Sequence, residues 1–129
     1  MSDQLKIGLE QKVEMIVSEQ LTAKEVGSGA VEVFATPMMI ALMEKAAAQC
    51  VQPYLEETQA TVGTRVDISH MAATPVGVKV YAQAELKEID KKKLVFSVEA
   101  FDEKGKIGEG THERFIIDVE RFMNKVNTK

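Results

Sequence analysis

The stretch from Phe34 to Leu55, FATPMMIALMEKAAAQCVQPYL, constrains the fold of this chain more than any other segment. Drawn as a helix, it is apolar on nearly every side, because its polar residues form only a thin line: Lys45, Gln49, Gln52 and Glu56. A helix of this kind must be enclosed by other elements. Thr36 can cap its start, and Pro37 suits the first helical position. The stretch therefore predicts a central helix inside a packed domain.

Charge and length narrow the class of protein. The helix is nearly long enough to span a bilayer, but Glu44 and Lys45 interrupt it where charge is costly in lipid, so we expect no membrane partner. At 129 residues, positions 1–129 are expected to form one domain. The net charge of −4 offers no basic surface for nucleic acid. The start, MSDQLKIGLEQK, has no secretion signal, which predicts a cytoplasmic location, and Cys50 alone excludes an internal disulfide.

Glu44 departs from the polar line of the helix. It lies about 110° from the centre of that line. One turn away on either side are only apolar residues: Ile40, Ala41, Ala47 and Ala48. A buried carboxylate without a partner is costly, so either another element supplies one or Glu44 belongs to a wet functional site. The alternative is that Glu44 lies at the edge of the solvated stripe.

Alternating apolar and polar residues predict strands at 7–17, 61–71 and 76–89, a Val/Phe-rich run predicts one at 94–102, and residues of one phase predict one at 106–118. The connections at 90–93 and 102–105 are short and polar, as in antiparallel hairpins. One strand, one long helix and four more strands predict an α+β domain of the hotdog type. In that fold an antiparallel sheet of about five strands wraps around one long central helix. Its open edge predicts a homodimer. The GSG loop at 27–29 and the tail from residue 124 are expected to be weakly ordered.

His70 is the most informative residue of the predicted strands. It shares its phase with Val62, Thr64, Val66 and Ile68, which predicts that it faces the helix. A lone inward histidine is usually a packed core residue, but this one shares a small domain with Glu44 and with the Thr36 hydroxyl. We therefore favour a functional site, in which Thr36 acts as a helix cap, as a site residue, or as both. In the last strand, one phase holds Ile107, Thr111, Phe115 and Ile117.

Several segments resemble the hotdog-fold thioesterases similar to fluoroacetyl-CoA thioesterase. The resemblance covers VFATPMMIALMEKAA (33–47), TVGTRVDISHMAATPVG (61–77), VKVYAQAEL and LVFSVEAFDEKGKIGEGTHERFIID (94–118). In that family a Thr, a Glu and a His form the catalytic set, which implies Thr36, Glu44 and His70 as catalytic residues here. The TVGT segment implies Gly63 and Thr64 as substrate-binding residues, with the Gly63 N–H holding the thioester carbonyl.

The resemblance implies an acyl-CoA thioesterase that hydrolyses its substrate to a free acid and coenzyme A without a cofactor or a metal. Glu44 would act as general base or as nucleophile, His70 would move the proton, and Thr36 would orient His70 or the carbonyl. The fluoroacetyl-specific member has an aromatic lid before the helix, where this chain has GSGA at 27–30. We therefore expect no fluoroacetyl specificity. The sequence gives no role for His112 in GTHER.

Two other functions share this fold. A non-catalytic acyl-CoA binding or sensing module would keep the cleft without turnover, but such a module has no need for Glu44 in an apolar setting. A hydratase acting on enoyl thioesters would use an acid/base pair, and the Thr, Glu and His set fits hydrolysis better. Thiol release separates the thioesterase from the binding module, and hydration of a crotonyl thioester identifies the hydratase.

Overall fold

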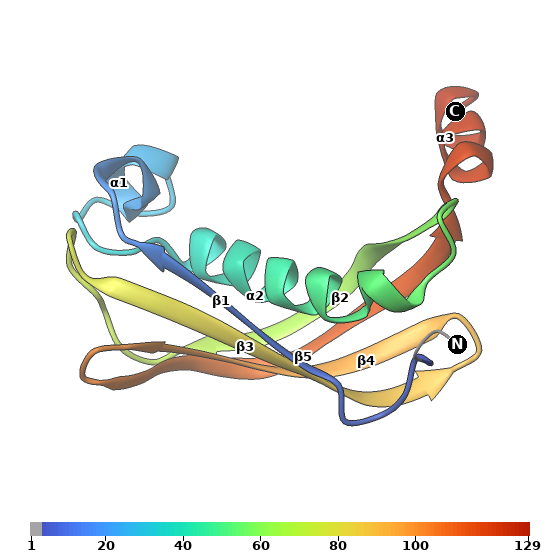
Figure 1. Cartoon of the computed structure of the whole chain (residues 1–129). Coiled ribbons are helices and arrows are strands. Elements are labelled where there is room, and N and C mark those ends of the chain that lie inside the picture. Colours follow the sequence, from blue (N-terminus) through green and yellow to red (C-terminus); the bar gives the residue numbers. More distant parts are fainter. Residues whose placement is uncertain (1–3) are drawn as a thin grey trace.

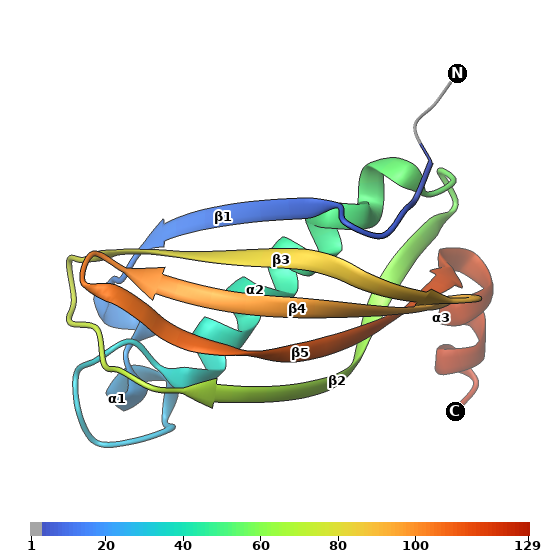
Figure 2. The same ribbon diagram turned by 90° about the horizontal axis from the view of Figure 1, so that it is seen from below.

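A long helix lies across the concave face of a curved antiparallel sheet in the computed structural model, which describes residues 4–129 (Figure 1). The helix is α2 (Thr36–Val51). The sheet has five strands in the order β1-β3-β4-β5-β2, with β1 and β2 at its edges (Figure 2). The strands are β1 (Glu10–Ile16), β2 (Gln59–His70), β3 (Lys79–Asp90), β4 (Lys93–Asp102) and β5 (Gly105–Asp118). The predicted hotdog arrangement is confirmed.

Short helical elements complete the described chain. They are α1 (Ala23–Val26), single 3₁₀ turns at Glu19–Leu21 and Gln52–Tyr54, and α3 (Val119–Asn127). The expectation of a weakly ordered tail is wrong, because α3 continues β5 and projects away from the sheet (Figure 1). Asp118 caps α3 by accepting a hydrogen bond from the backbone N–H of Arg121 at 3.0 Å. No helix within residues 4–129 combines the length and apolar character needed to cross a membrane.

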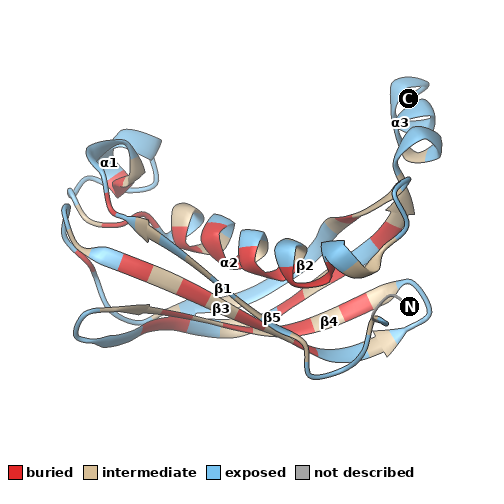
Figure 3. Cartoon of the chain, in the orientation of Figure 1, coloured by how far each residue is buried: buried red, intermediate tan, exposed pale blue. Residues whose placement is uncertain are grey.

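The core lies between α2 and the concave face of the sheet (Figure 3). On the sheet side, alternate residues of two central strands are buried: Val80, Ala82, Ala84 and Leu86 in β3, and Leu94, Phe96, Val98 and Ala100 in β4. On the helix side, the buried residues are Met39, Leu42, Met43, Ala46, Ala47, Cys50 and Val51. The opposite side of α2, with Ala41 and the polar line, faces solvent in this chain.

The ends of α2 differ from the prediction. The residue that precedes the first helical turn is Ala35, and no side chain caps it, so the predicted cap by Thr36 is wrong. The Thr36 hydroxyl contacts His70 instead. The α-helix ends at Val51 and a 3₁₀ turn follows, because Pro53 has no N–H and cannot continue the α-helical hydrogen bonding.

A β-bulge divides β2 into two halves that face in opposite phase. The register with β5 shifts between Gly63 and Arg65, which leaves Thr64 as the extra residue. Before the bulge, Thr61 is buried and Gly63 faces α2. After it, His70 reaches α2, as its hydrogen bond to Thr36 shows. The predicted phase is therefore confirmed for His70 and wrong for the residues before the bulge.

The last strand, β5, also faces in the phase opposite to the one that its apolar residues suggest. Thr111 and Phe115 are exposed, whereas His112 and Arg114 are buried. Ile107 is buried because the register between β4 and β5 shifts near the start of β5. A strand with an irregularity cannot keep one alternation over its whole length. Thr111, Phe115 and Ile117 share one phase as predicted, and the prediction is wrong for Ile107.

Candidate active site

A first polar cluster forms where the start of α2 meets the end of β2. Thr36 Oγ1 lies 2.7 Å from His70 Nδ1, so the two residues share a hydrogen bond. They are 34 positions apart in the sequence. Both line a cavity of about 300 Å³, whose other walls are Ala23, Ser28, Val33, Phe34, Met71, Ala72 and Ala73. Two of the three predicted catalytic residues therefore meet at a cavity.

The second ring nitrogen of His70 is unused. Its Nε2 is buried and has no hydrogen-bond partner among residues 4–129. Burial lowers the pKa of His70 from its ordinary value of 6.5, and the backbone of Ala72 offsets part of that shift. The ring is therefore neutral at pH 7, with Nδ1 occupied by Thr36 and Nε2 available to a substrate group.

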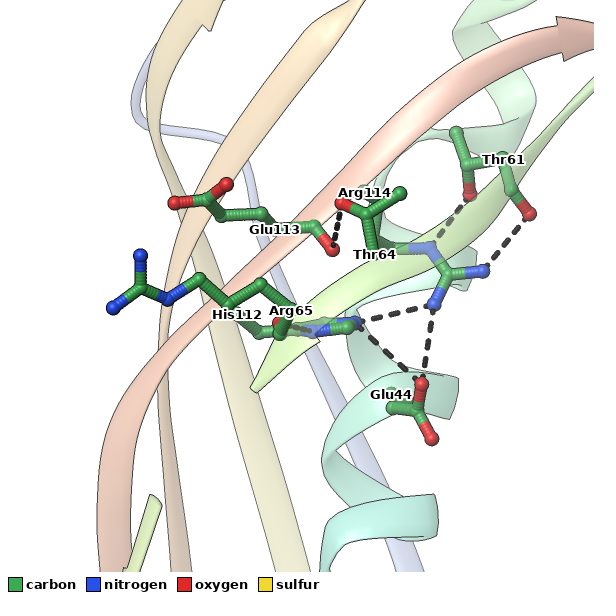
Figure 4. Close-up of polar contacts among 7 residues, drawn as sticks. All are labelled: Glu44, Thr61, Thr64, Arg65, His112, Glu113 and Arg114. Atoms are coloured by element: carbon green, nitrogen blue, oxygen red, sulfur yellow. Dashed lines mark hydrogen bonds and ion pairs between the residues drawn. The ribbon is translucent and has the colours of Figure 1, made fainter. Parts of the chain in front are cut away.

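A second polar cluster surrounds the third predicted residue, Glu44, in the middle of α2. The Glu44 side chain is 41% exposed, and its Oε2 lies 3.9 Å from Arg114 Nη1 and 3.9 Å from His112 Nε2 (Figure 4). Its partners come from β5 rather than from the helix. Glu44 thus lies at the edge of the solvated stripe of α2, and another element also supplies a cation beside it. The sequence had left these two descriptions open as alternatives, and both apply.

Arg114 is held in place from three directions. Its Nε donates to Thr61 Oγ1 at 2.7 Å, its Nη2 donates to the Thr61 carbonyl at 2.9 Å, and its Nη1 contacts His112 Nε2 at 3.2 Å. Burial lowers the pKa of Arg114, with Glu44 opposing the shift, but a guanidinium remains charged at neutral pH. The site therefore contains a fixed positive charge facing the Glu44 carboxylate.

Gly63 gives this carboxylate its space. A Cβ at position 63 would lie 2.7 Å from Glu44 Oε2, closer than side chains pack. Thr64, also predicted to bind substrate, donates its hydroxyl to the Glu113 carbonyl at 3.2 Å. The side chains of Arg65 and Glu113 point away from Glu44 (Figure 4). Gly63 therefore lies against Glu44, and substrate binding by Gly63 and Thr64 remains a prediction.

The two clusters are separate within one chain. Thr36 and Glu44 are eight residues apart, which is about 12 Å along the helix axis. The sequence reasoning missed Arg114 and Thr61 and gave His112 no role. The available signal was a pair of polar residues, His112 and Arg114, at alternate positions of β5 and in phase with Ile116.

Solved structures of thioesterases share this arrangement. The chain superposes on the fluoroacetyl-CoA thioesterase FlK with a TM-score of 0.92, at 35% sequence identity, covering 98% of each chain. A Thermus thermophilus protein of the thioesterase superfamily matches with a TM-score of 0.86 at 29% identity, covering 95% of this chain and 93% of the other. The fold therefore places the chain in the class of hotdog-fold thioesterases.

Sequence comparison narrows this class. The profile of the family described as fluoroacetyl-CoA-specific thioesterase matches residues 17–120. The fluoroacetyl-CoA thioesterase of Streptantibioticus cattleyicolor is 44% identical over 98 residues, which are 76% of this chain and 70% of that protein. The chain belongs to the fluoroacetyl-CoA-specific thioesterase family and is a thioester hydrolase.

Proposed function

We propose that this protein hydrolyses acyl-CoA thioesters to a free acid and coenzyme A, and that fluoroacetyl-CoA is not its specific substrate. The observation that carries this proposal is the Thr36–His70 hydrogen bond beside a cavity of about 300 Å³. Structures of FlK variants bound to fluoroacetate with CoA, and to acetyl-CoA, support a CoA thioester as the substrate class.

Each polar group has a role in the proposed reaction. Glu44 attacks the thioester carbonyl carbon directly or removes a proton from the attacking water, and either route needs its carboxylate at that carbon. In the nucleophilic route the C–S bond breaks as an anhydride forms between the acyl group and Glu44, and water then hydrolyses this anhydride to the free acid. In the general-base route water attacks the carbonyl carbon itself and the C–S bond breaks as the free acid forms. In both routes His70 Nε2 receives the proton that the water loses, directly or from Glu44, and passes it to the CoA thiolate. Arg114 and Gly63 lie beside Glu44, and the guanidinium and the Gly63 N–H would stabilise the negative charge that develops on the carbonyl oxygen.

The walls of the cavity support a broader acyl specificity. Residues 27–30 are GSGA, and Ser28 and Ala73 line the cavity with small side chains. Phe34, the aromatic residue among the cavity walls, is 1% exposed and packs in the core. We expect acetyl-, propionyl- and butyryl-CoA to be hydrolysed within about tenfold of fluoroacetyl-CoA. A preference of about 100-fold or more for fluoroacetyl-CoA would contradict this part of the proposal.

The test of the catalytic assignment is thiol release from a panel of acyl-CoA thioesters by the wild type, Glu44→Gln and the control Glu57→Gln, which alters an exposed carboxylate outside both clusters. Glu44→Gln is expected to lower kcat by about 10²-fold or more while the melting temperature is kept. Near-normal turnover in Glu44→Gln would remove Glu44 from the mechanism. Binding of acyl-CoA without turnover by the wild type would favour the sensing module, and hydration of crotonyl-CoA would favour the hydratase.

We also propose that the enzyme acts as a homodimer. In the described chain β2 pairs on one side only, with β5, and its Val66 side chain is 45% exposed. This edge carries Gly63 and His70, so a second copy along it would lie at the site. The separation of about 12 Å between Thr36 and Glu44 along α2 supports a site completed by the partner copy.

Sedimentation should give a dimer mass, and mixing two inactive variants tests whether the site is shared. If each site takes His70 from one protomer and Glu44 from the other, Glu44→Gln mixed with His70→Ala regains about a quarter of wild-type activity through heterodimers with one intact site. A monomer mass would contradict the dimer, and a mixed dimer without regained activity would contradict the shared site.

A further inference from the structure

His112 is a buried histidine for which the reaction outlined above has no use. Its side chain is 1% exposed, and its Nδ1 lies 2.8 Å from the backbone carbonyl oxygen of Arg65 across the β2–β5 ladder (Figure 4). A carbonyl oxygen only accepts hydrogen bonds, so Nδ1 must carry the hydrogen. The backbone of β2 therefore selects the tautomer of the ring.

This tautomer leaves Nε2 as an acceptor in the neutral ring. Arg114 Nη1 lies 3.2 Å from it, and a guanidinium can only donate, so the bond runs from Arg114 to His112. Burial lowers the pKa of His112, and the charge of Arg114 lowers it further. The Arg65 carbonyl and the carboxylates of Glu44 and Glu113 act in the opposite direction. A protonated ring would direct an N–H against the guanidinium, so the geometry requires the neutral form.

His112 fixes the one arm of Arg114 that faces Glu44. The other two bonds of the guanidinium, from Nε and Nη2, both go to Thr61. Among the described residues, His112 is the hydrogen-bond partner of Nη1, the same atom that lies 3.9 Å from Glu44 Oε2. Without His112, Arg114 would keep its attachment to Thr61, and its Nη1 would be free to tilt.

We propose that His112 is a positioning residue: its neutral, Nδ1-protonated ring accepts a hydrogen bond from Arg114 and thereby aims Nη1 at Glu44 and the thioester. This inference rests on the proposed role of Glu44. A displacement of about 1 Å in a site of this kind can cost about 10²-fold in rate, although His112 itself never touches the substrate. The loss should therefore appear in kcat more than in KM.

Two substitutions separate the two bonds of the ring. His112→Gln places an amide oxygen near the position of Nε2, which keeps the acceptor for Arg114 and loses the donor to Arg65. His112→Asn keeps a donor near Nδ1 and loses the acceptor. We expect kcat to stay within about threefold for Gln and to fall about 10- to 100-fold for Asn, with Thr111→Ala on the exposed face of β5 as the matched control.

The proposal is overturned if the Asn variant is at least as active as the Gln variant. A double-mutant cycle with Arg114→Lys adds a test of the route. If His112 acts only through Arg114, then His112→Asn lowers kcat little further in the Arg114→Lys background. Fully additive losses would show that His112 does not act through Arg114.

A measurement on the resting wild-type enzyme is independent of activity and of variant folding. The chain has two histidines, so long-range ¹H–¹⁵N correlation spectra distinguish them readily, with His112→Gln assigning the signal. The Nδ1–H tautomer of His112 at pH 7 is expected. An Nε2–H tautomer or an imidazolium would overturn the inference even if Glu44 is confirmed as catalytic. If Glu44→Gln proves fully active while the tautomer is as expected, the proposed role of Glu44 fails and the hydrogen bonds of His112 stand.

Discussion

Gly63→Ala tests whether the space beside Glu44 matters for the reaction. An added Cβ would lie 2.7 Å from Glu44 Oε2, 3.2 Å from His112 Cε1 and 3.3 Å from Arg114 Nη1. Ordinary van der Waals contact begins at 3.4 Å, so the carboxylate oxygen must retreat by about 0.7 Å. The other two contacts need shifts of about 0.1 to 0.2 Å. The substitution therefore displaces the Glu44 carboxylate and leaves its neighbours nearly in place.

The expected effect is a loss of activity without a loss of stability. The displaced atom is the end of a flexible, half-exposed side chain, and alanine in a strand is favoured over glycine by about 0.5 to 1 kcal/mol, so the melting temperature should change little. A displacement of this size is expected to lower kcat by about 10- to 100-fold. Because alanine keeps the backbone N–H at position 63, a loss reports displacement of Glu44 rather than loss of that donor.

Steady-state thiol release from acetyl-CoA, measured beside thermal unfolding, is the assay. Glu44→Asp provides the matched background, since its shorter side chain leaves room for the new methyl group. In that background Gly63→Ala should lower kcat by no more than about twofold. A Gly63→Ala enzyme with wild-type kcat and an unchanged melting temperature would refute the reasoning. Equal losses in both backgrounds would refute it as well.

Two further predictions concern the histidines. His70→Ala should abolish most turnover. The wild-type rate should decline below about pH 6.5, because protonation removes the base form of the ring, and His70→Ala should lack this decline. A variant as active as the wild type at every pH would make His70 a core residue only. Burial lowers the pKa of both His70 and His112, so the unfolded chain binds protons first as the pH falls below 6.5. The urea concentration at the unfolding midpoint should therefore decrease as the pH is lowered from about 7.5 to about 5. A midpoint that stays constant over this range would contradict the prediction.

Local pattern was enough to predict most of the fold. The long apolar helix and the alternation over 76–89 predicted a sheet wrapped around α2, and the buried face of β3 is the apolar one. The pairing of Thr36 with His70 was implied only by the family resemblance, but the inward phase of the last part of β2 predicted that His70 faces the helix. These features depend on spacings within single elements, which a sequence displays directly.

The surroundings of Glu44 could not be predicted in this way. They depend on the bulge at Thr64, which inverts the phase of the first half of β2, and on a register shift in β5. An extra residue in one strand has no fixed sequence signature, and it moves every side chain before it to the other face. The sequence therefore gave no indication that Arg114 is a buried cation beside Glu44. The helix α3 was missed because its amphipathic pattern is short.

The burial of Cys50 on the sheet-facing side of α2 makes the chemical step directly observable. The residue is 4% exposed, and burial raises its pKa to about 11, with Glu10 adding to the shift. A thiol reagent therefore reacts with released coenzyme A and not with Cys50, even when the enzyme concentration is close to that of the substrate. If Glu44 is a nucleophile, and the acyl–Glu44 intermediate forms faster than water hydrolyses it, the reaction starts with a burst of one thiol per active site. A general base gives a linear trace from the first turnover.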